Sequence, residues 1–171
     1  MNREFGYPAY GPDGVQSLTA VDGPFADALM DTSVIRLEAG GEKRFLLPGQ
    51  ECAFLLIEGE VTFCWNGETV SGSRESCFDG GAEVCALHVP RNTAVTLRAA
   101  CPSDVFVVST ENKRDFPARF YAAEDIRNVT SCAEICGGTC ERTVTTVFDD
   151  ETAPYSNLVL GETYPLPGKW C

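Results

Sequence analysis

The sequence of 171 residues predicts an all-β fold, built as a sandwich or a barrel of short strands. From residue 32 onward, turn signals recur between short apolar runs, and helical periodicity is almost absent. Asn66-Gly67 is the strongest of these signals, because both residues tolerate the positive φ angles of a type I′ hairpin turn. Seven or more strands at this spacing are typical of a sandwich or a barrel.

The expected strands differ in the faces that they bury. Residues 52–57 form a continuous apolar run, which is the pattern of a strand buried on both faces. Residues 58–60 predict a tight turn, and the apolar residues of 61–65 alternate so that they share one face. The further expected strands are 33–38, 42–47, 84–89, 93–99, 105–110, 142–148 and 157–160.

The pattern divides the chain into four segments. Residues 1–31, rich in Gly and Pro, are expected to form an N-terminal arm with little regular structure, and residues 32–112 form the barrel. Residues 113–141 predict a linker with a short helix at 122–129 and a cysteine-containing loop. Residues 142–171 carry the last strands and a proline-rich ending, and we expect them to open a further domain that the chain does not finish.

Composition excludes several kinds of partner. The formal net charge is −12, so the clustered Lys and Arg that bind phosphate are missing, and neither nucleic acid nor anionic lipid is an expected partner. No run approaches the roughly 18 apolar residues of a membrane span, and residues 1–10 lack the apolar stretch of a secretory signal. We therefore expect a cytoplasmic protein whose nine cysteines are reduced thiols.

Four motifs follow one another in the chain: FLLIEGEVTF at 54–63, SCFD at 76–79, LHVP at 87–90 and APYSNLVLGE at 153–162. In this order they resemble the first part of the 5-deoxyglucuronate isomerase family of inositol catabolism, which is similar to the 5-keto-4-deoxyuronate isomerases. The resemblance covers about residues 32–170. It implies a bicupin: a cupin-type barrel (double-stranded β-helix, or jelly roll) over 32–112, and an extended C-terminal tail, 142–171, that begins a second, incomplete cupin.

The resemblance also implies an activity, the aldose–ketose isomerisation that interconverts 5-deoxy-glucuronate and 5-dehydro-2-deoxy-gluconate. A divalent metal, expected to be zinc, would stabilise the enediolate while held by several His and one Glu. The family's ligands lie beyond the segment that matches 165–170, so no catalytic or metal residue is carried over. We expect a truncated chain without the metal-bearing half, inactive alone. The alternative is a non-catalytic cupin module for ligand binding or oligomerisation.

The spacing of metal-binding cupins can be tested on the first barrel. The Glu ligand of such cupins comes seven residues before the turn glycine, a position that Cys52 occupies here relative to Gly59. Their last His follows the proline of a second motif by five residues, where Val95 follows Pro90. We therefore expect this barrel to bind no metal.

Three tail residues, Arg142, Asn157 and Tyr164, are candidates for binding the substrate, because the opening strands of a second barrel could direct polar side chains into a sugar pocket. Arg142 would pair with the carboxylate of a small-molecule sugar acid. Ordinary surface polarity explains the same residues equally well. His88 is the single histidine and is either a proton shuttle or a hydrogen-bonded core residue; we favour the second interpretation.

Cys132, Cys136 and Cys140 form a C-x3-C-x3-C run. An iron–sulfur or zinc site is one interpretation, but thiolate sites use tighter C-x2-C pairs and need a fourth ligand. Free loop thiols that are easily oxidised are the interpretation we favour. We also expect a homo-oligomer, because the apolar tail strands would otherwise leave unpaired edges.

Overall fold

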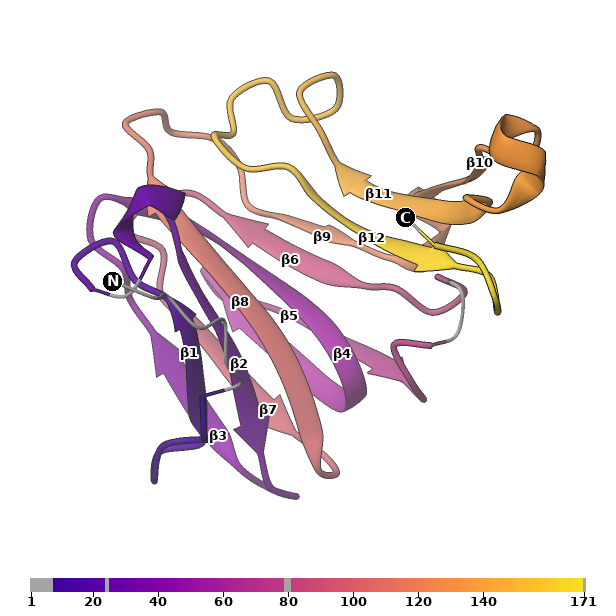
Figure 1. The fold of residues 1–171 in the computed structure, drawn as a ribbon. Helices are drawn as coiled ribbons and strands as arrows, with labels where there is room; N and C mark the ends of the chain where they lie inside the picture. Colours follow the sequence, from indigo (N-terminus) through magenta and orange to yellow (C-terminus); the bar gives the residue numbers. More distant parts are fainter. Residues whose placement is uncertain (1–7, 24, 79–80, 171) are drawn as a thin grey trace.

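The computed structural model describes residues 8–23, 25–78 and 81–170. These residues form twelve strands and three 3-10 turns, and none of them lies in an α-helix (Figure 1), so the predicted all-β class is confirmed. No helix in this part of the chain is long and apolar enough to span a membrane. The strands are β1 Val15–Thr19, β2 Asp31–Leu37, β3 Glu42–Phe45, β4 Gln50–Trp65, β5 Glu68–Arg74, β6 Ala86–Val89, β7 Val95–Ala99, β8 Ser103–Glu111, β9 Arg119–Tyr121, β10 Arg127–Ser131, β11 Arg142–Phe148 and β12 Leu160–Pro165.

Strand β4 joins two layers of antiparallel strands, called the barrel below, in which, among the described residues, the end strands β1 and β9 do not pair with each other and the sheet stays open. The first half of β4 pairs with β6 and β8, in the sheet ordered β1-β2-β8-β4-β6-β9, and its second half pairs with β5 and β7. Between the halves the pairing with β8 shifts register at Leu56/Glu58, which is a β-bulge, and Gly59 follows with φ +103. The strand therefore bends from one layer into the other, as in a jelly roll, and the cupin-type fold is confirmed.

The main core lies between these layers, and a second core lies outside them. Phe54 and Leu56 of β4 point into the first, together with Phe63 and Leu97 from the other layer. The intervening β4 residues Ala53 and Leu55 belong to the second core. The apolar run at 52–57 is continuous because both faces of this strand are covered, as the sequence predicted.

The second core is closed by an antiparallel sheet of three strands, ordered β10-β11-β12. Figure 1 shows this sheet beside β6 and β9, on the outer side of the barrel. Its buried side chains include Phe148 at the end of β11 and Leu160 at the start of β12, which pack with Ala53, Leu55 and Tyr121. The C-terminal segment is thus attached to the barrel by apolar contacts.

Several local predictions are wrong. The segment expected to be an arm with little regular structure contains β1, which pairs with β2 from Val15↔Ile35 onward. The turn expected at 58–60 is the bulge inside β4, since Gly59 bends the strand without ending its pairing. The helix expected at 122–129 is a 3-10 turn, Ala123–Asp125, followed by β10, whose β-branched Val129 and Thr130 suit a strand.

The predicted linker and tail also differ in their pairing. The segment 113–141 contributes β9 to the barrel and β10 to the second sheet, so it is more regular than a linker. The last strand runs over Leu160–Pro165 rather than 157–160, and Pro165 closes it opposite Arg142. The boundary near residue 112 and the assignment of 142–171 to a second cupin remain predictions.

Candidate functional site

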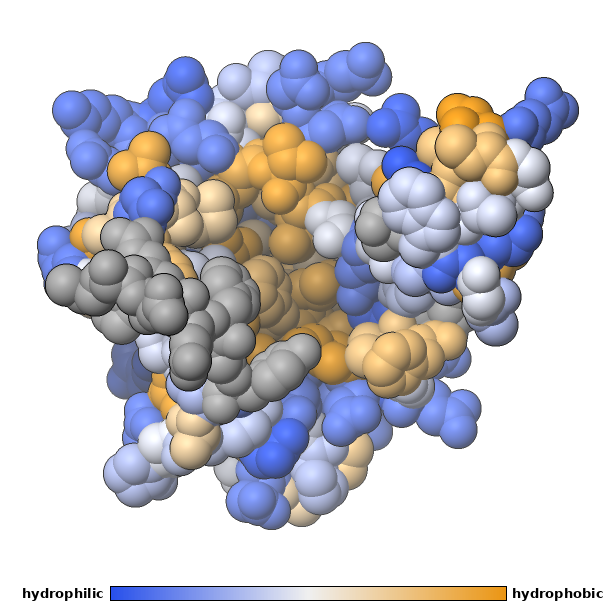
Figure 2. All heavy atoms as spheres, in the orientation of Figure 1, coloured by the Kyte–Doolittle hydropathy of each residue, from blue (hydrophilic) through white to orange (hydrophobic). Residues whose placement is uncertain are grey.

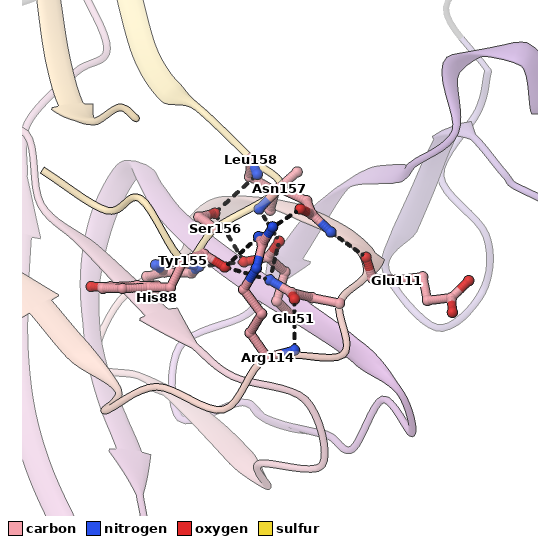
Figure 3. A network of polar contacts seen from close by, with 9 residues as sticks. Glu51, His88, Glu111, Arg114, Tyr155, Ser156, Asn157 and Leu158 are labelled. Atoms are coloured by element: carbon pink, nitrogen blue, oxygen red, sulfur yellow. Dashed lines mark hydrogen bonds and ion pairs between the residues drawn. The ribbon is translucent and has the colours of Figure 1, made fainter. Parts of the chain in front are cut away.

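Glu51 on β4 is the centre of a buried polar network (Figure 3). Its Oε1 accepts hydrogen bonds from Asn112 Nδ2 at 3.1 Å and from the backbone N–H of Asn157 at 2.6 Å. Its Oε2 accepts from His88 Nε2 at 2.9 Å and from Ser156 Oγ at 2.9 Å. Each carboxylate oxygen has two lone pairs, so four donors saturate the group.

The protonation state of Glu51 follows from these contacts. Burial raises its pKa, but the hydrogen bonds from His88, from the Asn157 backbone and from Ser156 lower it by more. The pKa therefore lies below the ordinary value of 4.5, and the carboxylate is ionised at neutral pH. A charged group inside the protein is tolerated here because every oxygen lone pair has a donor.

His88 is buried in the same network, with 1% of its surface exposed. Its ring stacks on Phe148, with ring centres 4.3 Å apart and planes inclined by 10°, and it also lies 4.7 Å from Phe116. Nε2 faces Glu51, and Nδ1 has no hydrogen-bond partner among the described residues. This environment agrees with a hydrogen-bonded core histidine and leaves no open path for a proton shuttle.

A polar layer covers the network at the end of the barrel. Arg114 donates to the carbonyl of Tyr155 at 3.1 Å and to Asn157 Oδ1 at 3.0 Å, while Asn157 Nδ2 donates to the carbonyl of Glu111 at 2.9 Å. A pocket of about 330 Å³ opens here, and a larger one of about 700 Å³ shares part of its wall. Both volumes fall in the range of small-molecule sites. The smaller pocket is lined by Glu111, Asn112, Lys113, Arg114 and Asn157.

The three predicted substrate-binding residues lie in different places. Asn157 belongs to the Glu51 network and lines the pocket. Arg142 donates to the carbonyl of Cys140 at 3.3 Å, in the cysteine loop. Tyr164 receives a hydrogen bond from the Arg74 guanidinium at 2.6 Å and donates one to Glu162. The structure therefore does not gather them around one ligand.

The Arg74 cluster connects the barrel to the second sheet. Arg74, which ends β5, is 1% exposed and pairs bidentately with Glu162 of β12, at 3.0 and 2.9 Å. It also donates to the carbonyl of Leu56 at 3.0 Å. Burial and the hydrogen bond to Glu162 raise the pKa of Tyr164, so this hydroxyl stays protonated. Tyr164 therefore helps to connect β5 of the barrel to β12 of the second sheet.

The sequence reasoning missed Glu51, Asn112, Arg114 and Ser156. One signal was available, because Glu51 comes directly before an apolar run, where a carboxylate is buried only if it is paired. The partners themselves could not be found by spacing, since Ser156 and Asn157 are 105 and 106 residues away along the chain.

The KduI/IolB family matches residues 8–171. The chain belongs to this family. Among solved structures it is similar to an IolB-like protein from Salmonella typhimurium LT2, with a TM-score of 0.71 and 16% identity over 85% of this chain and 54% of that one. The chain therefore spans about half the length of that relative. No curated protein matches the sequence.

Two further structures share the fold with this KduI/IolB chain. The putative glyoxylate induced protein from Pseudomonas aeruginosa has a TM-score of 0.59 and 13% identity, over 84% of this chain and 54% of that one. Protein Ylba from E. coli has a TM-score of 0.55 and 15% identity, over 86% of this chain and 62% of that one. At such identities the likeness concerns the fold alone.

The described residues of this KduI/IolB chain do not fit a metal. Within 8–23, 25–78 and 81–170, no three His, Cys, Asp or Glu side chains are placed to hold an ion. Glu51 and His88 form the best pair, but the four donors to Glu51 occupy the lone pairs that a cation would need. Cys52, at the ligand position of metal-binding cupins, is buried in the apolar core, which raises its pKa.

Proposed function

We propose that this chain serves a cytoplasmic sugar-acid isomerase that interconverts 5-deoxy-glucuronate and 5-dehydro-2-deoxy-gluconate in myo-inositol catabolism. The observation that carries the proposal is the family match over residues 8–171. The fold shared with the IolB-like protein over 85% of this chain supports it. In this role the chain contributes one cupin and the sheet β10-β11-β12 attached to it.

The chemistry of the reaction limits what these residues contribute. Moving a carbonyl from C1 to C2 needs a base that transfers a proton and an electrophile that stabilises the enediolate. The buried acid–base pair described above, Glu51 and His88, is enclosed and saturated with hydrogen bonds. We infer that the base and the divalent metal, expected to be zinc, come from a second cupin domain, in the same gene product or in a partner chain.

A domain exchange tests whether the catalytic groups come from the second cupin domain. Residues 8–170 would replace the matching segment of a family member of established isomerase activity, and conversion of 5-deoxy-glucuronate would be followed by NMR. We expect the chain alone with added zinc to be inactive and the chimaera to turn over substrate at a rate comparable to its parent. Turnover by the chain alone would place the catalytic groups within it, and a folded but inactive chimaera would contradict the isomerase role.

A second candidate function is a module that binds a sugar acid without converting it. The pocket beside Asn157 favours it, because Lys113 and Arg114 line that pocket in a chain whose net charge is −12. A local cation is what an anionic sugar needs on an acidic surface. Asn157, whose side-chain amide makes one donated bond to Glu111, would supply a further hydrogen bond to its hydroxyl groups.

Calorimetry with glucuronate as the probe distinguishes this candidate. We expect binding that Lys113→Ala weakens about tenfold, as the loss of about 1.4 kcal/mol from one charged contact requires. Lys43→Ala is the matched control, since Lys43 pairs with Asp13 outside the pocket. Equal effects of the two substitutions, or no measurable binding, would remove this candidate.

A further inference from the structure

The loop between β10 and β11 holds three thiols that neither function uses. Its ends are held together, because Ser131 pairs with Arg142 across the two strands. Within the loop, Cys140 Sγ lies 3.5 Å from the carbonyl of Ile135 and 3.8 Å from that of Cys132. The chain therefore turns back on itself and brings the thiol of Cys140 to the start of the loop.

Cys132 and Cys140 differ in their surroundings. Cys132 is partly exposed, and Ser131 Oγ lies 3.5 Å from its sulfur. The Arg142 guanidinium donates to the carbonyl of Cys140 at 3.3 Å, so its positive charge lies beside the two cysteines. Cys140 is buried, with 7% of its surface exposed, and its thiol contacts the backbone of Cys132. A reagent from solvent therefore meets Cys132 first.

The pKa shifts of the two thiols have opposite directions. The hydrogen bond from Ser131 lowers the pKa of Cys132, and the charge of Arg142 and the hydrogen bonds from Cys140 and Arg142 lower it further. Burial raises the pKa of Cys140, and the neighbouring Cys132 and Cys136 raise it further. Of the two thiols, Cys132 therefore loses its proton more readily, while Cys140 stays protonated to higher pH.

Three cysteines outside this loop have raised pKa values. Burial raises the pKa values of Cys52 and Cys77, and it raises that of Cys85 to about 11. Since the thiolate is the reactive form, these three react slowly at neutral pH. Among the thiols with shifted pKa values, Cys132 in the β10–β11 loop is therefore expected to react fastest.

We propose that Cys132 and Cys140 are a peroxide-reactive thiol pair, in which Cys132 is oxidised first and Cys140 then closes a disulfide. The Cys132 thiolate attacks one oxygen of hydrogen peroxide, the O–O bond breaks, and hydroxide leaves and is protonated to water. The sulfur loses two electrons and becomes a sulfenic acid, Cys132–SOH. Arg142 positions and stabilises the attacking thiolate.

The second step uses the neighbouring thiol. Cys140 loses its proton and attacks the Cys132 sulfur; the S–O bond breaks, hydroxide leaves as water once protonated, and the S–S bond forms. In total, two thiols and one peroxide give one disulfide and two waters. The Cys140 thiol already lies 3.8 Å from the backbone carbonyl of Cys132, so a rearrangement within the loop brings the sulfurs to the bonding distance of about 2.05 Å. A metal interpretation of the same cysteines receives no support, since no three ligating groups in the described residues are placed around an ion.

Peroxide titration of the reduced full chain tests the proposal, with intact mass and peptide mapping as readouts. We expect a single disulfide between Cys132 and Cys140, seen as the loss of two hydrogen atoms and reversed by dithiothreitol. Cys140→Ser should stop at the sulfenic acid, which dimedone labels at Cys132. Cys132→Ser should abolish both products. A first disulfide that includes Cys136, or dimedone labelling spread over several cysteines, would overturn the pairing.

Further variants test the choice of cysteines and the role of the Arg142 charge separately. Cys136→Ser removes the exposed thiol at the tip of the same loop and should leave the Cys132–Cys140 product unchanged. Arg142→Met should slow alkylation of Cys132 by iodoacetamide at neutral pH, because it removes a positive charge that lowers the pKa of Cys132, whereas Arg142→Lys should retain most of the rate. Equal rates in the Met and Lys variants would remove Arg142 from the mechanism. None of these readouts depends on isomerase activity.

Discussion

Glu51 connects parts of the chain that lie far apart in sequence. Its four donors come from β6, from the segment after β8 and from the segment before β12, at separations of 37 to 106 residues. The same side chain therefore fixes the end of the barrel and the approach to the second sheet. This role follows from hydrogen-bond capacity, because few other groups accept four hydrogen bonds at once.

Glu51→Gln should destabilise the fold by about 3 kcal/mol, because the amide nitrogen would face a donor and leave buried groups unpaired. Urea unfolding followed by circular dichroism measures the change, with the slope m compared between variants. Glu60→Gln is the matched control, since Glu60 is exposed on the same strand and should change stability by less than about 0.5 kcal/mol. Similar losses in both variants would contradict the role of Glu51.

The same carboxylate makes stability depend on pH in a defined direction. The pKa of Glu51 is lower in the folded chain than its ordinary value of 4.5, so the unfolded chain binds more protons over this range. Its contribution to stability is therefore complete above pH 4.5 and is lost as the pH falls through the folded value. Urea midpoints measured from neutral pH to about pH 3 should fall more steeply for the wild type than for Glu51→Gln. Parallel curves would contradict the expectation.

At the scale of the element, β4 depends on Gly59, which follows the bulge between Leu56 and Glu58. A Cβ atom at this position would collide with the side chain of Ser103 and with the carbonyl of Pro102, and φ is +103. Gly67, in the hairpin turn after β4, also has positive φ but has open space around it. The two glycines thus separate the cost of the backbone conformation from the cost of a collision.

Gly59→Ala should be the more damaging substitution. Gly67→Ala adds only the cost of a left-handed conformation, about 1 kcal/mol, whereas Gly59→Ala adds a collision that shifts β8 as well. We expect the midpoint of thermal unfolding to fall at least twice as far for Gly59→Ala. Equal shifts would mean that glycine is not required at position 59 by the close approach of β8.

The elements that the sequence predicted well are those whose pattern is local. Residues 52–57 form a continuous apolar run because both faces of β4 are covered, and Asn66-Gly67 lies in the tight turn that its dipeptide predicts. Prediction failed where residues far apart in the sequence determine the local structure or the contacts of a side chain. Residues 127–131 became a strand because β11 pairs with them, and the partners of Glu51 are invisible to any local pattern. Arg142 and Tyr164 were assigned to one pocket by chemistry alone, but separate networks hold them.

At the scale of the whole molecule, the barrel has apolar side chains on its outer surface as well as inside. Figure 2 shows them gathered in the hollow over β4, β6 and β8, beside the sheet β10-β11-β12. That sheet covers part of this surface through Phe148, whose side chain is fully buried. The stability of the C-terminal segment is therefore a property of its contact with the barrel.

Phe148→Ala tests this attachment. The ring contacts His88 and Tyr121, with ring centres at 4.3 and 5.6 Å, so truncation leaves a cavity between barrel and sheet. A loss of about 3 to 5 kcal/mol is expected for a buried Phe. Amide hydrogen exchange should show β11 and β12 losing protection more than β2 and β8. Uniform loss across the chain would mean that the sheet and barrel unfold as one unit.

Strand β10 gives the molecule an exposed edge. Four of its five residues are exposed, including Val129 at 48%, and within the described residues only β11 pairs with it. An unpaired edge with an apolar side chain is a template for another chain, while a net charge of −12 per copy opposes association. We predict a homo-oligomer that pairs through β10 and becomes tighter as salt screens the charge.

Light scattering at micromolar concentration measures this association. The wild type should have a mass that is a multiple of 18.5 kDa, larger at high salt than at low salt. Val129→Lys places a charge on the strand and should shift the protein to the mass of one chain. Val159→Lys is the matched control, because Val159 is 69% exposed but lies outside β10, so its mass should stay that of the wild type. A wild-type monomer at every salt concentration would refute pairing through this edge, and dissociation by both substitutions would assign the interface to a different surface.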